Sequence, residues 1–492
     1  MNPIKQLAGQ TAIYGLSSII GRVIGYLLIP LYTRVFIPSE YGISNELYAY
    51  SSLLLVLITY GMETAFFRFS AMEKDNHKVY STALISLLAS TGLFLIIAFL
   101  VARPVAGLIR HSDHIEYIIW FALIVSMDAL TAIPFAYLRA VNKAKRFATI
   151  KLLNIFFYIG LNLFFLLLCP YLLNKGLFTG IINLIYNKEI GVGYIFISNL
   201  LASALTIVLL LPEYIGITYS FDRNLWKRMM RYALPLLVVG FAGIINETMD
   251  RIFLRFLLPE KIAMAQVGIY GACYKISLIM TIFIQAFRFA ADPFFFAKAR
   301  EQNAKQIYAD VMKYFVIICS FIFLVVMLYI DVIKYFVGEK YYEGLPIVPI
   351  LLIANMCLGI YYNLSIWYKL TDKTTFGAYI SIIGAVITTV LNISLIPVIG
   401  YLGSAWATLI CYASMMILSF FYGQRHYHVH YKMKKILGYI FLSLILFFVS
   451  KCIHFETMYI QYVLNTILLL IFAVVVCYFE KADFIKKPVT QQ

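Results

Sequence analysis

The sequence predicts an all-α integral membrane protein of about 14 transmembrane helices, and its composition is the first reason. Hydrophobic residues make up 62% of the 492 residues and charged residues only 13%, whereas a soluble chain has roughly 45–50% apolar and about 25% charged residues. So few polar side chains cannot cover a surface that faces water, and the apolar excess must face lipid. The composition therefore excludes a soluble enzyme, a secreted disulfide scaffold and a disordered chain.

The second reason is the length of the apolar runs. A transmembrane helix needs about 20 mostly apolar residues. Fourteen such runs follow one another with short connections: 10–33, 43–67, 80–102, 115–138, 150–172, 190–212, 232–257, 266–291, 311–330, 345–369, 375–396, 402–422, 434–452 and 458–479. The longest connection is 173–189, and we expect its apolar stretch at the membrane interface. No connection has room for a soluble domain.

The distribution of Lys and Arg predicts the side on which each connection lies. With the N-terminus in the cytoplasm, the inside segments carry 27 of these cations and the outside segments carry 11, while Arg22 and Lys275 fall inside spans. The excess holds along the whole chain, so we predict a multi-pass protein with both termini in the cytoplasm. This topology accounts for the net charge of +16, and no nucleic-acid partner is expected.

A weak internal repeat predicts how the spans are grouped. The segments Arg34–Ile43 and Arg255–Tyr270 follow the first and seventh spans, and both read as Arg, three apolar residues, Pro, an acid and then Gly-Ile. Six spans separate the copies, which predicts two parallel six-helix lobes around a central cavity, followed by two C-terminal helices. The predicted divisions are 1–220, 221–430 and 431–492. Within the second, the basic amphipathic segment 221–232 reads either as an interfacial linker helix or as a solvated positive loop.

This arrangement resembles the flippase branch of the MATE-like (MOP) superfamily, in particular the Wzx-type bacterial polysaccharide exporters. The resemblance covers nearly the whole chain and rests on four loose motifs: Gly15-Leu-Ser-Ser-Ile-Ile-Gly21-Arg22, Pro38-Ser-Glu-Tyr-Gly42, Asp250-Arg251-Ile and Val267-Gly-Ile-Tyr-Gly-Ala-Cys-Tyr-Lys275. It implies flipping of a prenyl-pyrophosphate-linked oligosaccharide, such as an O-antigen, capsule or exopolysaccharide repeat unit, across the bacterial cytoplasmic (inner) membrane. It further implies membrane lipids, a coupling ion (H⁺ or Na⁺) and other polysaccharide-assembly proteins as partners, and no enzymatic activity.

Cations at bilayer depth are candidate substrate ligands, because a buried charge costs about 2.5–3.5 kcal/mol on insertion scales and is kept for a reason. Arg22 lies near the middle of the first span, too deep to reach either interface, and Lys275 lies about nine residues into the eighth. We predict that both line a cationic substrate-binding cavity, together with Arg251. For Arg22 the alternative is a structural ion pair with an acid on a neighbouring helix, and for Lys275 it is an ion pair or a side chain that reaches the interface from deep in the span.

Three acids in the spans are candidates for ion coupling or gating. Asp128, in the fourth span, is predicted either to bind H⁺ or Na⁺ or to neutralise Arg22. In the seventh span, Glu247 and Arg251 are four residues apart and can pair on one helix, which leaves Asp250 for another helix. This cluster reads either as a gate or as a self-neutralising structural group.

Aromatic side chains of the tenth span are the best candidates for stacking on sugar rings; the alternative is an ordinary interfacial belt. They are Tyr361, Tyr362, Trp367 and Tyr368.

No metal or cofactor is predicted. The nearest pattern to a metal site is an HxHxH run in an inside loop, but nothing nearby completes a ligand shell. No Walker A motif or Ser/His/Asp arrangement is found in the sequence.

Three other functions remain open from the sequence. A MATE-type H⁺/Na⁺-coupled drug antiporter would share the fold and have an acidic rather than a cationic cavity. A peptidoglycan-precursor flippase would share both the fold and the anionic head group. A membrane polysaccharide polymerase or ligase would need a large outside loop with an acid/base pair, and the outside loops here are short.

Overall fold

The computed structural model describes residues 20–485 except 22, 74, 300, 372, 454 and 456, and it leaves aside the side chains of 292, 293, 297 and 482–485. Within this part the chain is helical, with no strand. Twelve helices are long and apolar enough to cross a membrane, or thirteen if the bent pair Thr179–Ile190 and Gly193–Leu209 is one span. They coincide with the predicted runs, which confirms the all-α membrane fold. Of the first predicted span, residues 10–19 and Arg22 lie outside the described residues.

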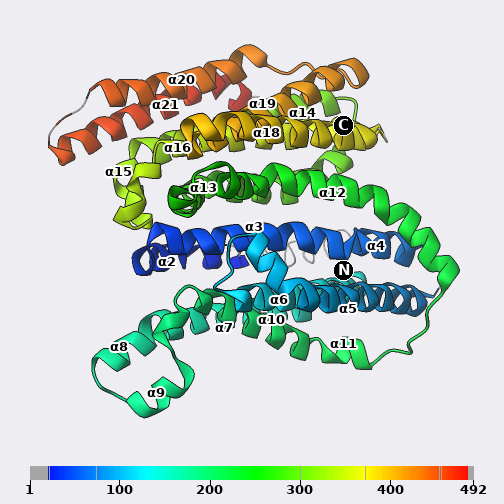
Figure 1. The fold of residues 1–492 in the computed structure, drawn as a ribbon. Coiled ribbons are helices and arrows are strands. Elements are labelled where there is room, and N and C mark those ends of the chain that lie inside the picture. Colours follow the sequence, from blue (N-terminus) through cyan, green and yellow to red (C-terminus); the bar gives the residue numbers. More distant parts are fainter. Residues whose placement is uncertain are drawn as a thin grey trace. The chain divides into compact units, whose positions relative to one another are not determined.

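The helices form two compact units that divide after Gly271. Unit 1 contains α2 (Ile29–Val35), α3 (Pro38–Thr59), α4 (Met62–Met72), α5 (Asn76–Leu108), α6 (Ile115–Ala140), α7 (Ala144–Leu163), α8 (Cys169–Asn174), α9 (Thr179–Ile185), α10 (Gly193–Leu209), α11 (Leu211–Ile215), α12 (Arg223–Leu257) and the start of α13 (Glu260–Lys298) (Figure 1).

Unit 2 contains the rest of α13 and the helices that follow. These are α14 (Ala304–Leu328), α15 (Ile330–Ile333), α16 (Ile347–Leu364), α17 (Ile366–Leu370), α18 (Thr375–Ile399), α19 (Tyr401–His426), α20 (Met433–Cys452) and α21 (Met458–Ile485). Within it, α16, α18 and α19 pack together, and α20 and α21 pack on α14. The two helices predicted after the second lobe are therefore attached to that lobe through α14.

Local sequence sets several helix ends. Pro38 occupies the first turn of α3, where its missing N–H costs nothing, and the Glu40 carboxylate accepts a hydrogen bond from the Ile37 amide at 3.1 Å. The predicted second span is broken between α3 and α4 at Tyr60 and Gly61, which both have positive φ. A Cβ on Gly61 would lie 3.1 Å from the carbonyl oxygen of Ala233. The break therefore also lets α12 approach closely.

The segment 221–232 is neither of the structures that the sequence suggested, since most of it is the first part of α12. Asp222 caps this helix by accepting hydrogen bonds from the amides of Asn224 (2.8 Å) and Leu225 (3.0 Å). The helix then continues as a single element through Pro235 to Leu257. No separate linker helix therefore precedes the seventh span.

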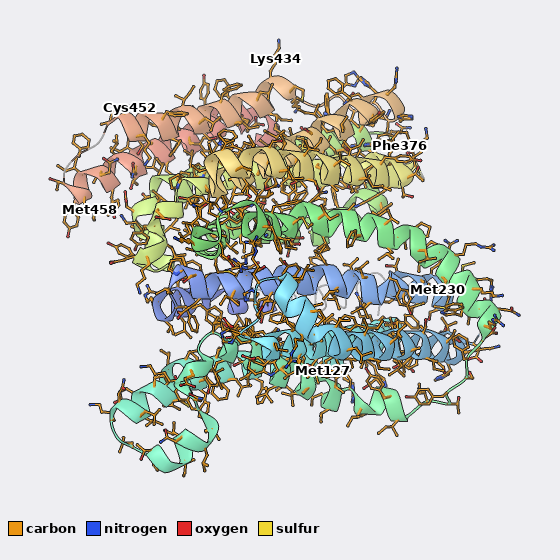
Figure 2. All side chains as sticks on the ribbon, viewed as in Figure 1. Met127, Met230, Phe376, Lys434, Cys452 and Met458 are labelled. Atoms are coloured by element: carbon orange, nitrogen blue, oxygen red, sulfur yellow. The ribbon has the colours of Figure 1, made fainter. Side chains whose placement is uncertain are left out.

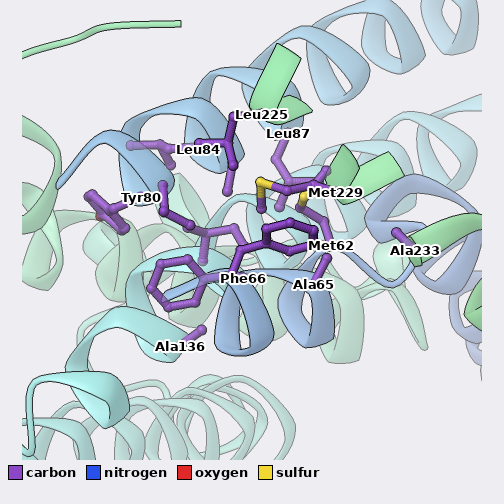
Figure 3. Packing of buried hydrophobic residues seen from close by; sticks show 14 of the residues in the cluster. Met62, Ala65, Phe66, Tyr80, Leu84, Leu87, Ala136, Leu225, Met229 and Ala233 are labelled. Carbon is purple, nitrogen blue, oxygen red and sulfur yellow. The ribbon is translucent and has the colours of Figure 1, made fainter. Parts of the chain in front are cut away.

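The core at one end of unit 1 explains why α12 packs with the first lobe. Met62 and Phe66 of α4, Tyr80 of α5 and Met229 of α12 are fully buried in one apolar cluster (Figure 3). Unit 1 therefore includes α12, and the predicted lobe boundary at 220 stays a prediction.

Candidate functional site

Unit 1 encloses a polar cavity of about 470 Å³ between α3, α4, α6, α7 and α10. Its lining includes Asp128 on α6, Lys151 and Asn154 on α7, and Asn199 and Ser203 on α10. Polar and charged groups at bilayer depth are costly unless they serve a cavity or a partner. A hollow built from this many of them is the strongest candidate site in the part of the chain that the structure describes.

Asp128 is the acid of the predicted coupling site that lines this cavity. Ser203 donates a hydrogen bond to its carboxylate at 2.9 Å. The Lys151 ammonium lies 4.1 Å from the centroid of the Phe135 ring, a cation–π contact, and its positive charge acts on Asp128. The carboxylate is thus held by one hydroxyl and attracted by one cation. Its role in ion coupling stays a prediction.

An ion pair between Arg139 and Glu63 also lines this cavity. The Arg139 guanidinium also lies 4.7 Å from the centroid of the Phe67 ring. Two cations and two acids line the cavity, so their formal charges cancel. This hollow is therefore neither the cationic cleft expected of an anion carrier nor the acidic cleft expected of a cation pump.

Hydroxyl and amide groups continue from the cavity into the interior of unit 1. Asn199 donates to the Tyr48 hydroxyl at 3.1 Å. Further along, the hydroxyl of Tyr32 lies 2.9 Å from that of Tyr158 and donates to the Asn162 side chain at 2.9 Å. These hydrogen bonds lie between α2, α3, α7 and α10.

A buried ion cluster joins three segments at the end of unit 1 that the charge distribution predicts to face outside. Glu46 of α3, fully buried, is 3.0 Å from the His111 ring in the α5–α6 turn and 3.7 Å from the Arg255 guanidinium near the end of α12. Arg255 also donates to the carbonyl of Arg110 at 3.1 Å. Because all three ionisable side chains are buried, separating them would expose charges that lack their partners.

The two copies of the internal repeat meet at this same end. A Cβ on Gly268 would overlap the carbonyl oxygen of Pro38, and a Cβ on Gly42 would overlap that of Met264. The starts of α3 and α13 therefore touch backbone to backbone, and only glycine allows this approach. The glycines of the repeat motif therefore permit this backbone contact, which the sequence alone did not reveal.

The predicted cluster of the seventh span is present, but its pairing differs from the prediction. Arg251 pairs with the neighbouring Asp250 carboxylate at 2.8 Å and takes only the backbone carbonyl of Glu247, at 2.7 Å. Asp250 is therefore not left for another helix, and the Glu247 side chain is exposed. Both members of the Arg251–Asp250 pair are buried, so the pair is self-neutralising.

Lys275, the other described residue of the predicted cationic cavity, lies on the part of α13 that belongs to unit 2 and is half-buried. Its role in binding the cargo stays a prediction.

The aromatic candidates of the tenth span lie on α16 and α17, where most of them are covered. Tyr361, Trp367 and Tyr368 are buried, and the Trp367 ring stacks on His426 at 5.4 Å. Only Tyr362 is half-buried, with the Arg288 guanidinium 3.9 Å from its ring centroid. Stacking of a sugar on these rings stays a prediction, and in this conformation three of them present no open face.

The sequence reading did not select Lys151, His111 or Glu46 as site residues. Lys151 lies at the start of the predicted span 150–172, where a lysine usually reaches water, but α7 begins earlier, at Ala144, and Lys151 lines the cavity. Glu46 lies near the start of the predicted second span, where an acid usually reaches water. The burial of Glu46 follows from its partners His111 and Arg255, which only the fold brings next to it.

Comparison with known proteins identifies the family. Residues 7–298 match the family model described as polysaccharide biosynthesis protein. No curated protein sequence gives a significant match. Among solved structures, the lipid II flippase MurJ in an inward closed conformation is 16% identical with a TM-score of 0.73, covering 95% of this chain and 99% of that chain.

Two further solved structures share the fold. An inward-facing multidrug resistance MATE family transporter of the MOP superfamily is 15% identical, with a TM-score of 0.66 over 85% of this chain and 94% of that chain. A mutant of the MATE transporter VcmN from Vibrio cholerae is 12% identical, with a TM-score of 0.58 over 86% and 96%. Because the family model spans more than half of the chain, this protein belongs to the polysaccharide biosynthesis protein family, on the MATE-like fold of the MOP superfamily.

Proposed function

We propose that this protein flips a prenyl-pyrophosphate-linked oligosaccharide from the inner to the outer leaflet of a bacterial cytoplasmic membrane. The observation that carries the proposal is the family match over residues 7–298, on a chain whose fold follows that of a lipid-linked precursor flippase over 95% of its length. The match favours saccharide cargo, and the fold favours a transporter that alternates between two openings. Both termini lie in the cytoplasm in this proposal.

The contacts at the predicted outer end support alternating access. They join α3, in the first predicted lobe, to α12 and the start of α13, in the second. Opening toward the outside requires the Gly268–Pro38 contact to part and Glu46 to leave Arg255. The closed outer end is therefore held by close backbone packing and a buried ion pair, and both are lost together when the lobes rock.

Arg22 and Lys275 are the proposed anchors for the pyrophosphate. An anionic head group that enters a half-dehydrated cleft needs cations to offset its lost hydration. Arg251 does not join them in this role, because Asp250 already neutralises it. Tyr362 remains the candidate for contact with the glycan.

Asp128 is the proposed coupling site, with H⁺ as the ion. Lys151 shares its cavity, and a fixed ammonium repels a dehydrated Na⁺. A proton on Asp128 instead removes the attraction between the carboxylate and Lys151, which can change how α6 and α7 pack. The tyrosine and asparagine series that begins at Tyr48 offers a route for that proton.

The first test is deletion of the gene, followed by identification of the lipid-linked intermediates in each leaflet. The proposal predicts that a lipid-linked oligosaccharide accumulates on the cytoplasmic leaflet and that drug susceptibility is unchanged. Accumulation of a peptidoglycan precursor would instead favour the related flippase. Increased drug susceptibility with normal glycan export would favour the drug antiporter.

The second test is Arg22→Ala in a complementation assay. Because this substitution removes a charged partner of the pyrophosphate, it should lower the delivery of the lipid-linked oligosaccharide to the outer face by about tenfold or more. Arg103→Ala is the matched control, because Arg103 is exposed near the end of α5. Full delivery by the Arg22→Ala protein would contradict the cationic anchor.

A further inference from the structure

Unit 2 contains an apolar cleft between α19 and α20, with a volume of about 380 Å³. Its floor is formed by buried side chains of the helices behind, among them Met312 of α14 and Leu364 of α16. Its rim is exposed: Ile417 and Phe421 on α19, and Leu437 on α20, are 47%, 67% and 46% exposed. Because α19 and α20 are both candidate spans, this opening faces the hydrocarbon of the membrane.

The loop between α19 and α20 closes one end of the cleft and begins a second, polar pocket. Tyr431 lines the apolar cleft, whereas the preceding residue, His430, lines a pocket of about 490 Å³ together with Lys305 and Gln306 of α14. His430 lies 3.2 Å from His428 between their Nε2 atoms. The HxHxH run noticed in the sequence therefore lies at a polar pocket, next to a lysine.

The two pockets share one face of α14. Lys305 and Met312 are seven residues apart, which is two helical turns, so their side chains lie on the same side of the helix about 10 Å apart. One end of this face is cationic and the other is apolar. This spacing matches a molecule with an anionic head and a hydrocarbon tail.

We propose that this composite site binds one anionic phospholipid of the surrounding membrane, with an acyl chain in the α19–α20 cleft and the phosphate near Lys305 and His430. The cleft supplies hydrocarbon contact, and the polar pocket supplies positive charge at the depth of the head groups. Basic pockets between transmembrane helices on the cytoplasmic side are suited to anionic head groups. The site lies wholly within unit 2 and does not depend on the proposed cargo.

The test measures lipid binding to purified, delipidated protein in detergent by thermal shift and native mass spectrometry. The probes are phosphatidylglycerol and phosphatidylcholine with identical acyl chains. Wild-type protein should bind phosphatidylglycerol about fivefold to tenfold more tightly than phosphatidylcholine. Equal binding of the two lipids by wild-type protein would overturn the proposal.

Two variants separate the head pocket from the cleft. Lys305→Ala with His430→Ala should reduce phosphatidylglycerol binding to the level of phosphatidylcholine. Leu437→Trp fills the cleft and should weaken the binding of both lipids. The matched controls are Lys434→Ala, whose side chain points away from the bundle (Figure 2), and Ile445→Trp, which is also exposed on α20. Neither residue lines the α19–α20 cleft or the pocket at Lys305, so both proteins should bind as wild type.

Three further outcomes would overturn the proposal. Unchanged phosphatidylglycerol binding by Leu437→Trp would exclude the cleft as the acyl site. If inorganic phosphate alone gives the same thermal shift as phosphatidylglycerol, only the head pocket contributes to binding and the cleft does not. Displacement of phosphatidylglycerol by a lower concentration of undecaprenyl phosphate would identify the occupant as the lipid carrier. The double alanine variant changes only exposed side chains, so its folding should be intact.

Discussion

The fully buried carboxylate of Glu480 offers the sharpest test of how the two last helices are held. Glu480 of α21 forms an ion pair with Lys313 of α14, which is also fully buried. Lys435 of α20 reaches the other carboxylate oxygen at 2.9 Å, and Tyr439 donates to that oxygen at 2.6 Å. One carboxylate thus binds side chains from both neighbouring helices.

We predict that Glu480→Gln lowers the apparent melting temperature by on the order of 10 °C. Removing one partner of a buried ion pair costs about 3–5 kcal/mol, and each kcal/mol shifts a domain of roughly 150–250 residues by about 2–4 °C. Among the described side chains, a carboxylate oxygen of Asp310 is 3.8 Å from the Lys313 ammonium and already binds Lys432 at 2.8 Å. Asp310 therefore cannot fully replace Glu480.

The measurement is the temperature at which half of the detergent-solubilised protein remains monodisperse by size exclusion. The control, Lys435→Ala, removes a partly exposed partner and should cost no more than about 1 kcal/mol. The double variant Lys313→Met with Glu480→Leu removes both buried charges and should recover most of the loss. A Glu480→Gln protein within about 2 °C of wild type, or a double variant as unstable as the single one, would refute this reasoning.

Three other predictions concern unit 1. Asp128→Asn should abolish the pH dependence of flipping in proteoliposomes. The control is Asp331→Asn, which changes an exposed acid in unit 2 and should keep the pH dependence. If the Asp128→Asn protein keeps the pH dependence, Asp128 is excluded as the coupling site. Gly268→Ala should prevent closure of the predicted outer end and raise the labelling of cysteines introduced there. Gly243→Ala is the control, because a Cβ on Gly243 has no atom within 4 Å, and it should leave the labelling unchanged. Equal labelling of the two variants would contradict the proposed contact. The pKa of Asp222 is lowered to about 2 by its hydrogen bond from a lysine and by amides of α12. Its stabilisation is therefore complete above pH 5 and is lost as the pH falls from about 4 toward 2, so the difference in melting temperature between wild type and Asp222→Ala should be constant from pH 5 to 8.

The positions of the membrane spans could be predicted because the length of an apolar run is a local property of the chain. The break between α3 and α4, inside the predicted span 43–67, could not be predicted in this way, since it depends on how closely α12 approaches Gly61. The repeat motif was also visible in the sequence. That its two copies touch each other at Gly42 and Gly268 required the fold.

The partners of the charged residues could not be predicted in the same way. A sequence gives the depth of a residue along its helix, but the neighbour that it meets depends on the rotation of that helix and on which helix packs beside it. Arg251 was predicted to pair with Glu247 and instead pairs with Asp250. Lys313 and Glu480 are 167 residues apart, and only the packing of α21 on α14 brings them together.

The sequence by itself determined that this chain is a bundle of membrane helices, because hydrophobicity acts on each segment separately. Only the tertiary structure decided which charges neutralise one another and which face a cavity, because the energy of a buried charge depends on the atoms within a few ångströms of it. The polar cavity around Asp128 and Lys151 is the clearest example, since it is built from helices whose sequences show no common motif.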